Sequence, residues 1–254
     1  MPSEPYLHAI DCLTQLGPQR AWSLVVTVFG DMAQARDQSL AGPTLSLLMT
    51  DMKVKPDALR VALHRLRADG WITSQKNGRT SRHALSEKGR RESQVATPVI
   101  YRRPEDMPSS WHAILLPDAD SENRTQLLAK GYVPVSPRLF VGSDLSRPPK
   151  DALVLEPTVV PAWVKSQLQD ESVAREYETL HTALLDVQTA LTELSEPSDI
   201  QIAVLRCLIV HNWRRLVLKH PALPKSLYPT EHKGTACRSL VMDLLDSLPR
   251  PTLA

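Results

Sequence analysis

The sequence predicts an α+β protein that is mainly helical. Apolar residues recur at helical spacing through several long segments, most clearly between residues 171 and 219. Between residues 111 and 155 the apolar runs are short and are closed by proline or glycine, which is typical of short strands. The Asn77-Gly78 pair, inside a polar and basic segment, predicts a β-hairpin in the N-terminal third.

The N-terminal domain, residues 1–97, is expected to carry helices over residues 20–32, 42–49 and 55–69. In the third helix Pro56 suits the first turn, where its missing N–H would be unpaired anyway. Val54 and Leu59 occupy the two positions of a hydrophobic staple. Lys55 is then the N-cap, which lysine fills poorly unless it is kept for a phosphate. Ser86 is expected to cap the next helix.

The hairpin is predicted with a type I′ turn centred on Asn77-Gly78, since both positions require positive φ. This register pairs Lys76 with Arg79, Ser74 with Ser81, and Ile72 with His83. Like charges opposite one another destabilise a sheet, so the first pair suggests that the tip meets an anion. A solvated basic hairpin without a partner is the alternative.

Together the third helix and the hairpin have the pattern of the recognition helix and wing of a winged helix-turn-helix, which binds double-stranded DNA. The residues expected to read base edges are Arg60, Val61 and His64. Phosphate contacts are expected from Lys55, Arg65, Lys76, Arg79 and Arg82.

Charge is concentrated in this region. The whole chain carries a net charge of +2, but residues 53–103 hold thirteen Lys and Arg against four Asp and Glu, a net charge of +9. The rest of the chain therefore sums to −7. This asymmetry indicates one nucleic-acid face and argues against general binding of polyanions.

A proline-marked connector, residues 98–108, is expected to lead into a small α+β domain that ends near residue 160. Its predicted elements are a helix over residues 121–130 and strands over residues 111–116, 132–135, 138–141 and 152–155. The C-terminal domain, residues 161–254, is expected to be helical over residues 161–168, 171–194, 199–219 and 234–248. The apolar stripe of the second of these helices, from Val173 to Leu194, predicts either core or a dimer seam.

Several classes of protein are disfavoured. Aromatic residues make up 5% of the chain, too few for a binder that stacks single-stranded bases. The sequence shows no signal peptide and no run of 18 apolar residues, so no membrane partner is expected. Three widely spaced cysteines, Cys12, Cys207 and Cys237, favour a reducing cytoplasm.

No enzyme motif is evident. Glycine-rich phosphate loops and the common hydrolase and protease motifs are absent, and the eight histidines lack metal-ligand spacing. We therefore expect no catalytic residues, no metal and no cofactor. A metal-dependent nuclease is the best enzyme alternative, because Asp118 and Asp120 follow the first central strand, where some ferredoxin-like nucleases bind a metal.

At several places the chain resembles the PaaX-type transcriptional repressors of bacterial phenylacetate catabolism. The N-terminal blocks are residues 20–31, residues 59–66 followed by Asp69-Gly70-Trp71, and residues 85–91. The later blocks are Trp111-His112 and residues 211–219, the latter with Pro221 and Leu223-Pro224. Residues 118–190 resemble the family only loosely.

The resemblance implies an N-terminal winged helix, a central ferredoxin-like domain and a C-terminal helical domain. It also implies a homodimer that represses transcription from a palindromic operator and is released by an acyl-CoA effector, phenylacetyl-CoA in the family's namesake. Coenzyme A would need basic groups for its phosphates and an aromatic face for its adenine. Candidates on one helix are His211, Trp213, Arg214, Arg215 and Lys219. Alternatively, Trp213 lies in the core and the arginines pair with acids, and the protein is a DNA-binding adaptor without a ligand.

Overall fold

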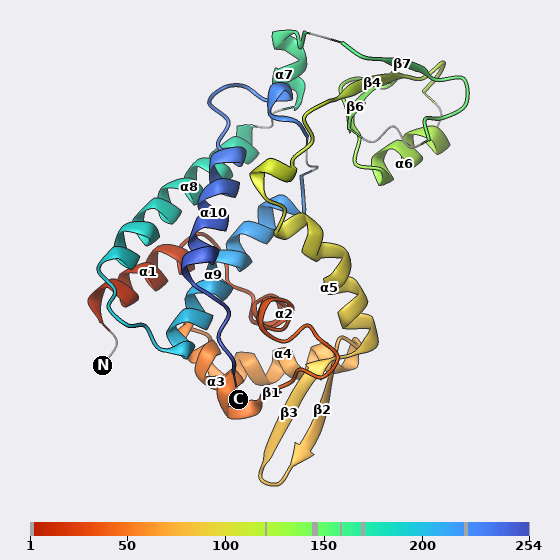
Figure 1. The fold of residues 1–254 in the computed structure, drawn as a ribbon. Coiled ribbons are helices and arrows are strands. Elements are labelled where there is room, and N and C mark those ends of the chain that lie inside the picture. The colour runs from red at the N-terminus through yellow and green to blue at the C-terminus, as the bar shows by residue number, and fades with distance from the viewer. Residues whose placement is uncertain are drawn as a thin grey trace.

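The structure is a computed structural model of the chain, and it describes residues 3–119, 121–143, 147–157, 159–168, 171–220 and 223–253. Figure 1 shows a helical body with two projections: the hairpin β2–β3 at one end and a small sheet with helix α6 at the other. The C-terminus of the chain lies beside the base of the hairpin, although the two are far apart in sequence. The fold is α+β and mainly helical, as predicted.

Helices provide most of the described structure. The α-helices of the N-terminal half are α1 (Glu4–Thr14), α2 (Ala21–Met32), α3 (Gly42–Asp51), α4 (Pro56–Ala68), α5 (Glu87–Ile100) and α6 (Ser121–Ala129). Those of the C-terminal half are α7 (Ala162–Leu168), α8 (Glu171–Thr192), α9 (Asp199–Val217) and α10 (Gly234–Ser247). Two short 3-10 helices are η1 (Pro104–Asp106) and η2 (Lys225–Leu227). Sequence analysis missed α1, whose buried face is Tyr6, Ala9, Ile10 and Leu13.

The N-terminal part has the element order of a winged helix-turn-helix. After α2 come strand β1 (Leu40–Ala41), helices α3 and α4, and the hairpin of β2 (Ile72–Asn77) and β3 (Thr80–Leu85). Strand β3 lies between β1 and β2, and both pairings are antiparallel. The hairpin therefore has a third strand only at its base, and its tip projects from the body (Figure 1).

The predicted hairpin register is wrong by two residues on the second strand. Lys76 pairs with Ser81, Ser74 with His83, and Ile72 with Leu85. The two-residue loop is Gly78-Arg79, with Gly78 at φ 61°, in the first loop position that a type II′ turn reserves for glycine. This register puts Ile72 and Leu85 together in the core. It also removes the Lys76–Arg79 like-charge pair from which an anionic partner was inferred.

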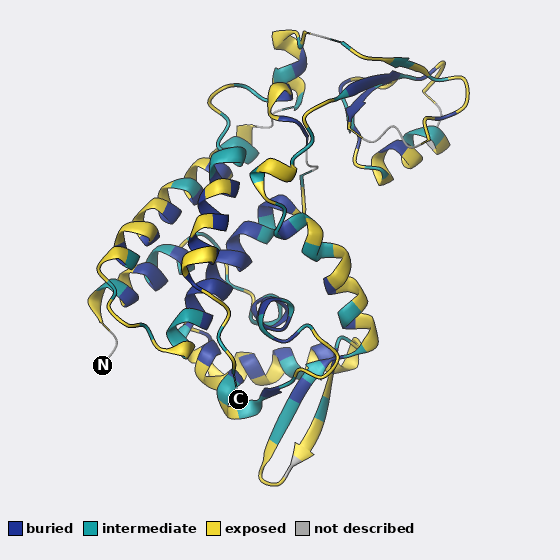
Figure 2. Cartoon of the chain, in the orientation of Figure 1, coloured by how far each residue is buried: buried dark blue, intermediate teal, exposed yellow. Residues whose placement is uncertain are grey.

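One hydrophobic core joins the N-terminal and C-terminal parts. It contains Leu24, Val25 and Phe29 of α2 together with Leu205 and Leu208 of α9, all fully or almost fully buried. Helix α9 is buried around most of its circumference, as the dark blue ribbon in Figure 2 shows. The α8 stripe also lies in this core, which resolves the choice between core and dimer seam for its buried residues in favour of core.

The central sheet contains β4 (His112–Leu115), β5 (Val133–Pro134), β6 (Leu139–Gly142) and β7 (Leu153–Leu155). Its order is β5-β6-β4-β7 and every pairing is antiparallel. This is the strand order of a ferredoxin-like sheet. No helix is assigned among the described residues between β6 and β7, so only α6 of the two crossover helices is present there. Val164 of α7 and Leu227 of η2 share a core cluster with this sheet, although both were predicted to belong to the C-terminal domain.

The connector begins later than predicted. Helix α5 continues to Ile100 with Pro98 inside it, so the expected boundary at residues 97 and 98 falls within a helix. Proline has no N–H, so one hydrogen bond of the last turns of this helix is lost. The Ser86 cap is present: its hydroxyl accepts the N–H of Gly89 at 3.0 Å.

Candidate nucleic-acid interface

Helix α4 is built to present one face to solvent. Lys55 is its N-cap in extended conformation with no side-chain cap, and Pro56 occupies the first turn, as predicted. Leu59, Ala62 and Leu66 are buried and fix the helix on the core. The opposite face is therefore held rigidly while it stays open to a partner.

The three predicted base readers lie on that open face. Arg60, Val61 and His64 are all exposed, and Val61 is 70% exposed. A branched apolar side chain this open has no packing role in the chain, and an apolar contact is what a thymine methyl group offers in the major groove. The face therefore combines an arginine, an apolar group and a histidine within two helical turns.

Arg60 and Arg65 have intramolecular partners that a nucleic acid can replace. Arg60 Nη2 lies 2.6 Å from Asp57 Oδ1, and both side chains are more than three-quarters exposed. Arg65 Nε lies 3.6 Å from Asp69 Oδ2, and Arg65 Cζ lies 5.6 Å from the centre of the Trp22 ring. Exposed pairs of this kind are worth about 0–1 kcal/mol, so exchanging them for base or phosphate contacts costs little.

Of the three wing cations predicted to contact phosphate, two are exposed and one is bound within the chain. Lys76 and Arg79 are exposed near the tip of the hairpin. Arg82, which was predicted to contact phosphate, is half-buried: its Nε donates to Ser39 Oγ at 2.9 Å and its Nη2 to the Ser39 carbonyl at 3.0 Å. Arg82 therefore ties the wing to the segment before β1.

Two further features fix the base of the wing, and neither has a local signal in the sequence. His83 is buried, and its Nδ1 lies 2.7 Å from Ser74 Oγ. Burial, with a smaller contribution from Arg67, lowers the pKa of His83. At Gly89 an added Cβ would collide with the Trp71 carbonyl oxygen, which explains why glycine occupies the place where a capping box would have glutamate.

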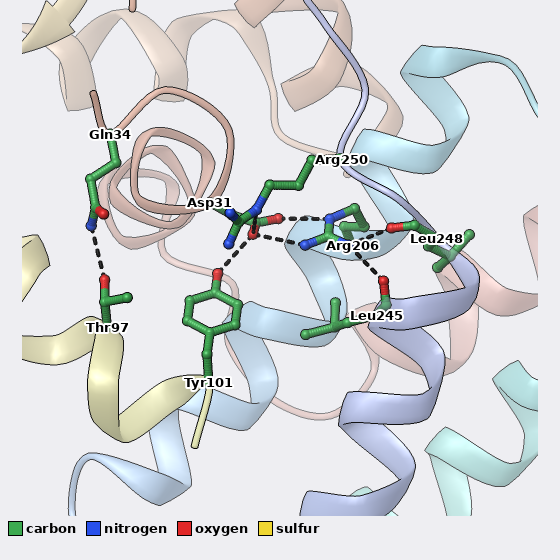
Figure 3. A network of polar contacts seen from close by, with 8 residues as sticks. All are labelled: Asp31, Gln34, Thr97, Tyr101, Arg206, Leu245, Leu248 and Arg250. Atoms are coloured by element: carbon green, nitrogen blue, oxygen red, sulfur yellow. Dashed lines mark hydrogen bonds and ion pairs between the residues drawn. The ribbon is translucent and has the colours of Figure 1, made fainter. Parts of the chain in front are cut away.

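A buried ion-pair network attaches the winged helix to the C-terminal helices (Figure 3). The Asp31 carboxylate of α2 accepts two hydrogen bonds from Arg206, from Nε and Nη2, both at 3.1 Å. It also accepts one from the Tyr101 hydroxyl at 2.7 Å and one from Arg250 Nε at 3.0 Å. Arg206 also donates to the carbonyls of Leu245 and Leu248 at the end of α10. The Asp31 and Arg206 side chains are 0% and 5% exposed. Residues of α9, the end of α5 and the segment after α10 thus converge on the carboxylate of α2.

The five predicted effector residues do not gather at one cavity. His211 contacts Thr27 through Nδ1 at 3.1 Å, Trp213 Nε1 donates to the Ile100 carbonyl at 2.8 Å, and Arg214 donates to Ser23 at 2.9 Å. These three contacts join α9 to α2 and to the end of α5. Arg215 lines a cavity of about 310 Å³ beside α8, and Lys219 lines a different one of about 770 Å³ beside the central sheet.

The described residues give little support to the metal-dependent nuclease that was the alternative interpretation. Asp118 is exposed, and Asp120 lies outside the described residues. In the described part of the chain no three His, Cys, Asp or Glu side chains are grouped so that they could hold a metal ion.

No described helix is long and apolar enough to cross a membrane.

The chain is similar to known proteins along most of its length. Residues 20–89 match the family described as PaaX-like protein, and residues 168–252 match the PaaX-like protein C-terminal domain. The chain is 24% identical over 273 aligned residues to the transcriptional repressor PaaX of Escherichia coli K12, covering 97% of this chain and 85% of the repressor. An uncharacterised protein of Mycobacterium tuberculosis, Rv0674, has a similar fold, with a TM-score of 0.55 and 19% identity over 90% of this chain and 95% of that one.

Proposed function

The chain belongs to the family of PaaX-like proteins, and on this basis we propose that it is a bacterial transcriptional regulator that binds double-stranded DNA through α4 and the wing. The repressor to which it is similar aligns with nearly the whole chain, which supports the same kind of function here. In this proposal Arg60, Val61 and His64 read base edges in the major groove.

The observation that carries the proposal is the exposed face of α4. Its residues are held by a fully buried stripe on the other side of the helix, so a groove can be read without rearrangement. Lys55 at the start of the helix, Arg65 on its flank, and Lys76 and Arg79 on the wing lie at positions suited to phosphates on either side. Arg82 acts mainly by positioning the wing, because both of its contacts are to Ser39.

A palindromic operator requires two copies of the chain. The half-sites must lie about 34 Å apart, or a multiple of this, so the two α4 helices need a fixed separation. Three exposed apolar side chains near the edge strand β7 are candidates for self-association: Leu153 of β7, Val159, and Trp163 of α7, which are 54%, 72% and 56% exposed. We place the dimer interface at these side chains, since exposed apolar groups that cluster commonly mark such contacts.

In this proposal the regulator acts as a repressor and is released by an acyl-CoA such as phenylacetyl-CoA. The three buried or half-buried α9 residues, His211, Trp213 and Arg214, join α9 to α2 and the end of α5. They therefore act as positioning residues, and of the two remaining candidates, which line different cavities, Lys219 is left to contact the effector. Helix α2 packs against α4, so a shift of α9 has a direct route to the DNA-binding helix.

The proposal is tested by measuring the affinity of the purified protein for the DNA upstream of its own gene and for random DNA, with and without phenylacetyl-CoA. Selective binding that the thioester abolishes is the expected result. Selective binding that ignores the thioester would leave a DNA-binding adaptor, and an absence of selective binding would contradict the proposal. The salt dependence should be steep, with a slope of about one per neutralised phosphate.

Two substitutions separate the assigned roles. Arg60→Ala should weaken operator binding by about 10- to 100-fold and leave random DNA nearly unchanged, because it removes a base contact. Arg79→Ala should weaken both DNAs alike and reduce the salt slope by about one. Lys225→Ala, at an exposed position on η2 far from the wing, is the matched control for loss of a positive charge. An equal effect of Arg60→Ala on both DNAs would refute its role as a base reader.

A further inference from the structure

The largest of the described cavities is a cleft between the central module and the helical body. It has a volume of about 770 Å³ and lies where the end of α6 and strand β5 face the C-terminal ends of α5 and α9. A cleft of this size is within the range of small-molecule and cofactor sites. Its walls belong to two bodies with separate hydrophobic cores, so a ligand in it would touch both.

The cleft walls are basic. Arg102, Lys130, Lys219 and His220 line it, and among the described lining residues there is no Asp or Glu. In the described part of the chain, none of Arg102, Lys130 and Lys219 forms an ion pair. Lys130 Nζ donates a hydrogen bond to the Arg147 backbone carbonyl. Cations that line one cleft without a counter-charge repel one another, and a bound anion would relieve that repulsion.

The same cleft has an apolar part. Leu128 of α6 and Leu218, directly after α9, are each 44% exposed and lie on its two sides. Val133 and Val217 extend these apolar walls. The two next-largest cavities, of about 590 and 310 Å³, differ in chemistry: the one beside the chain terminus is lined by Asp31 and Asp37, and the one beside α8 by Glu176. An acid-free lining that combines basic and leucine side chains is therefore specific to this cleft among these three.

We propose that this cleft is the effector site, and that it binds a ligand with phosphate groups at one end and an apolar acyl group at the other. The assignment to an acyl-CoA rests on the proposed function, whereas the site itself rests on the charge and shape of the cleft. Arg102, Lys130 and Lys219 hold the phosphates, because lysine and arginine form strong charge-assisted hydrogen bonds with phosphate oxygens. Leu128 and Leu218 cover the acyl group.

The position of the cleft also gives the ligand a mechanical effect. Lys219 follows the end of α9, and two residues within the last two turns of that helix bind neighbours: Trp213 the Ile100 carbonyl and Arg214 the α2 residue Ser23. A ligand that draws the two walls together would move the ends of α9 and α5 relative to the central module. If that module holds the dimer together, the same movement changes the separation of the two α4 helices.

A nucleic-acid backbone is the competing ligand for a basic cleft. The cleft lies beside the central module, however, and the wing projects from the opposite end of the helical body (Figure 1). DNA bound along α4 and the wing of the same chain would not enter it. We therefore assign the cleft to a small molecule, and DNA binding at the cleft is an outcome that the experiment must detect.

Calorimetric titration of the full chain with coenzyme A, phenylacetyl-CoA and phenylacetate tests the two parts of the site separately. Arg102→Gln and Lys219→Gln should weaken coenzyme A and its thioester equally, each by about tenfold, because they remove phosphate contacts. Leu128→Ser and Leu218→Ser should weaken the thioester but not coenzyme A. Lys225→Gln, outside the cleft, should change neither, and phenylacetate alone should bind far more weakly than the thioester.

The same variants are assayed on operator DNA without ligand, where they should keep the wild-type affinity. If the thioester binds wild type and the cleft variants equally, the site is wrong while the proposed regulator stands. If wild type binds neither coenzyme A nor the thioester, the ligand class is wrong. If the cleft variants lose operator affinity, the cleft binds nucleic acid and the proposal is overturned. Failure of the regulator itself would appear separately, as the lack of selective DNA binding by wild type.

Discussion

Removing the negative charge of Asp31 should destabilise the whole protein, because the winged helix and the C-terminal helices meet at this side chain. Asp31 accepts four hydrogen bonds, two of them from Arg206, and the Arg206 side chain is only 5% exposed. In Asp31→Asn the arginine stays buried without a counter-charge, and breaking a buried pair from one side costs about 3–5 kcal/mol. For a chain of this size that corresponds to a fall in Tm of roughly 10 °C.

The assay is urea denaturation followed by circular dichroism, with Asp246→Asn as the matched control. Asp246 forms an equally bidentate pair with Arg103, at 2.8 and 3.0 Å, but both partners are exposed, so its loss should be far smaller. In a second test, Asp31→Ala combined with Arg206→Met should recover part of the loss of Asp31→Ala alone, since no charge then stays buried. If Asp31→Asn costs no more than Asp246→Asn, the network does not hold the two parts together.

Four further substitutions probe the fold and the wing. Burial, and to a smaller extent the charges of Arg214 and Arg215, lowers the pKa of His211 to about 3. As the pH falls from 6.5 towards 3, the unfolded state therefore binds a proton that the folded state does not, and the stability of the wild type should fall. His211→Asn should remove up to about 2 kcal/mol of the stability difference between pH 6.5 and pH 5, as seen in denaturation at both pH values. Gly89→Ala should destabilise the protein by about 1–3 kcal/mol, because the added Cβ collides with Trp71. Gly30→Ala in α2, where a Cβ meets nothing within 4 Å, should stabilise it by about 0.5–1 kcal/mol. If thermal denaturation shows a change in Tm of the same sign for both variants, this prediction is wrong. Arg82→Lys keeps the charge but loses at least one of the two bonds to Ser39, so DNA affinity should fall while the salt slope stays constant, and an unchanged affinity would contradict the positioning role.

The sequence located most helices because their causes are local. Pro56 in the first turn, the Val54 and Leu59 staple, and the Ser86 cap each act within one or two turns of the chain. Helix α1 was missed because its stripe of buried residues gains meaning only against α8 and α9. The hairpin register failed for a related reason: Asn77-Gly78 satisfies one turn type, but burial of Ile72 opposite Leu85 selected the neighbouring register.

The exposure of the candidate DNA-binding residues was predictable only where it follows from the helical period. The open face of α4 could be read from its sequence, since Leu59, Ala62 and Leu66 mark the opposite side. The role of Arg82 could not, because its partner Ser39 lies 43 residues away and has no pattern of its own. The effector candidates on α9 failed to converge because this helix is buried almost all round, so basic and aromatic residues adjacent in sequence point to different neighbours.

The shared core has a consequence for how a signal could reach the DNA. In a regulator with separate domains, a linker would have to pass the movement on, but here α2 contacts both α4 and α9, and α2, α4 and α9 share one hydrophobic core. Such a body deforms internally only by small shifts, because packed cores resist larger ones. The central module has cores of its own and lines the basic cleft together with the helical body. In the proposed dimer, an effector in the cleft would therefore act by re-orienting the central module against this body, and Asp31→Asn, which loosens the body itself, should weaken operator binding even without effector.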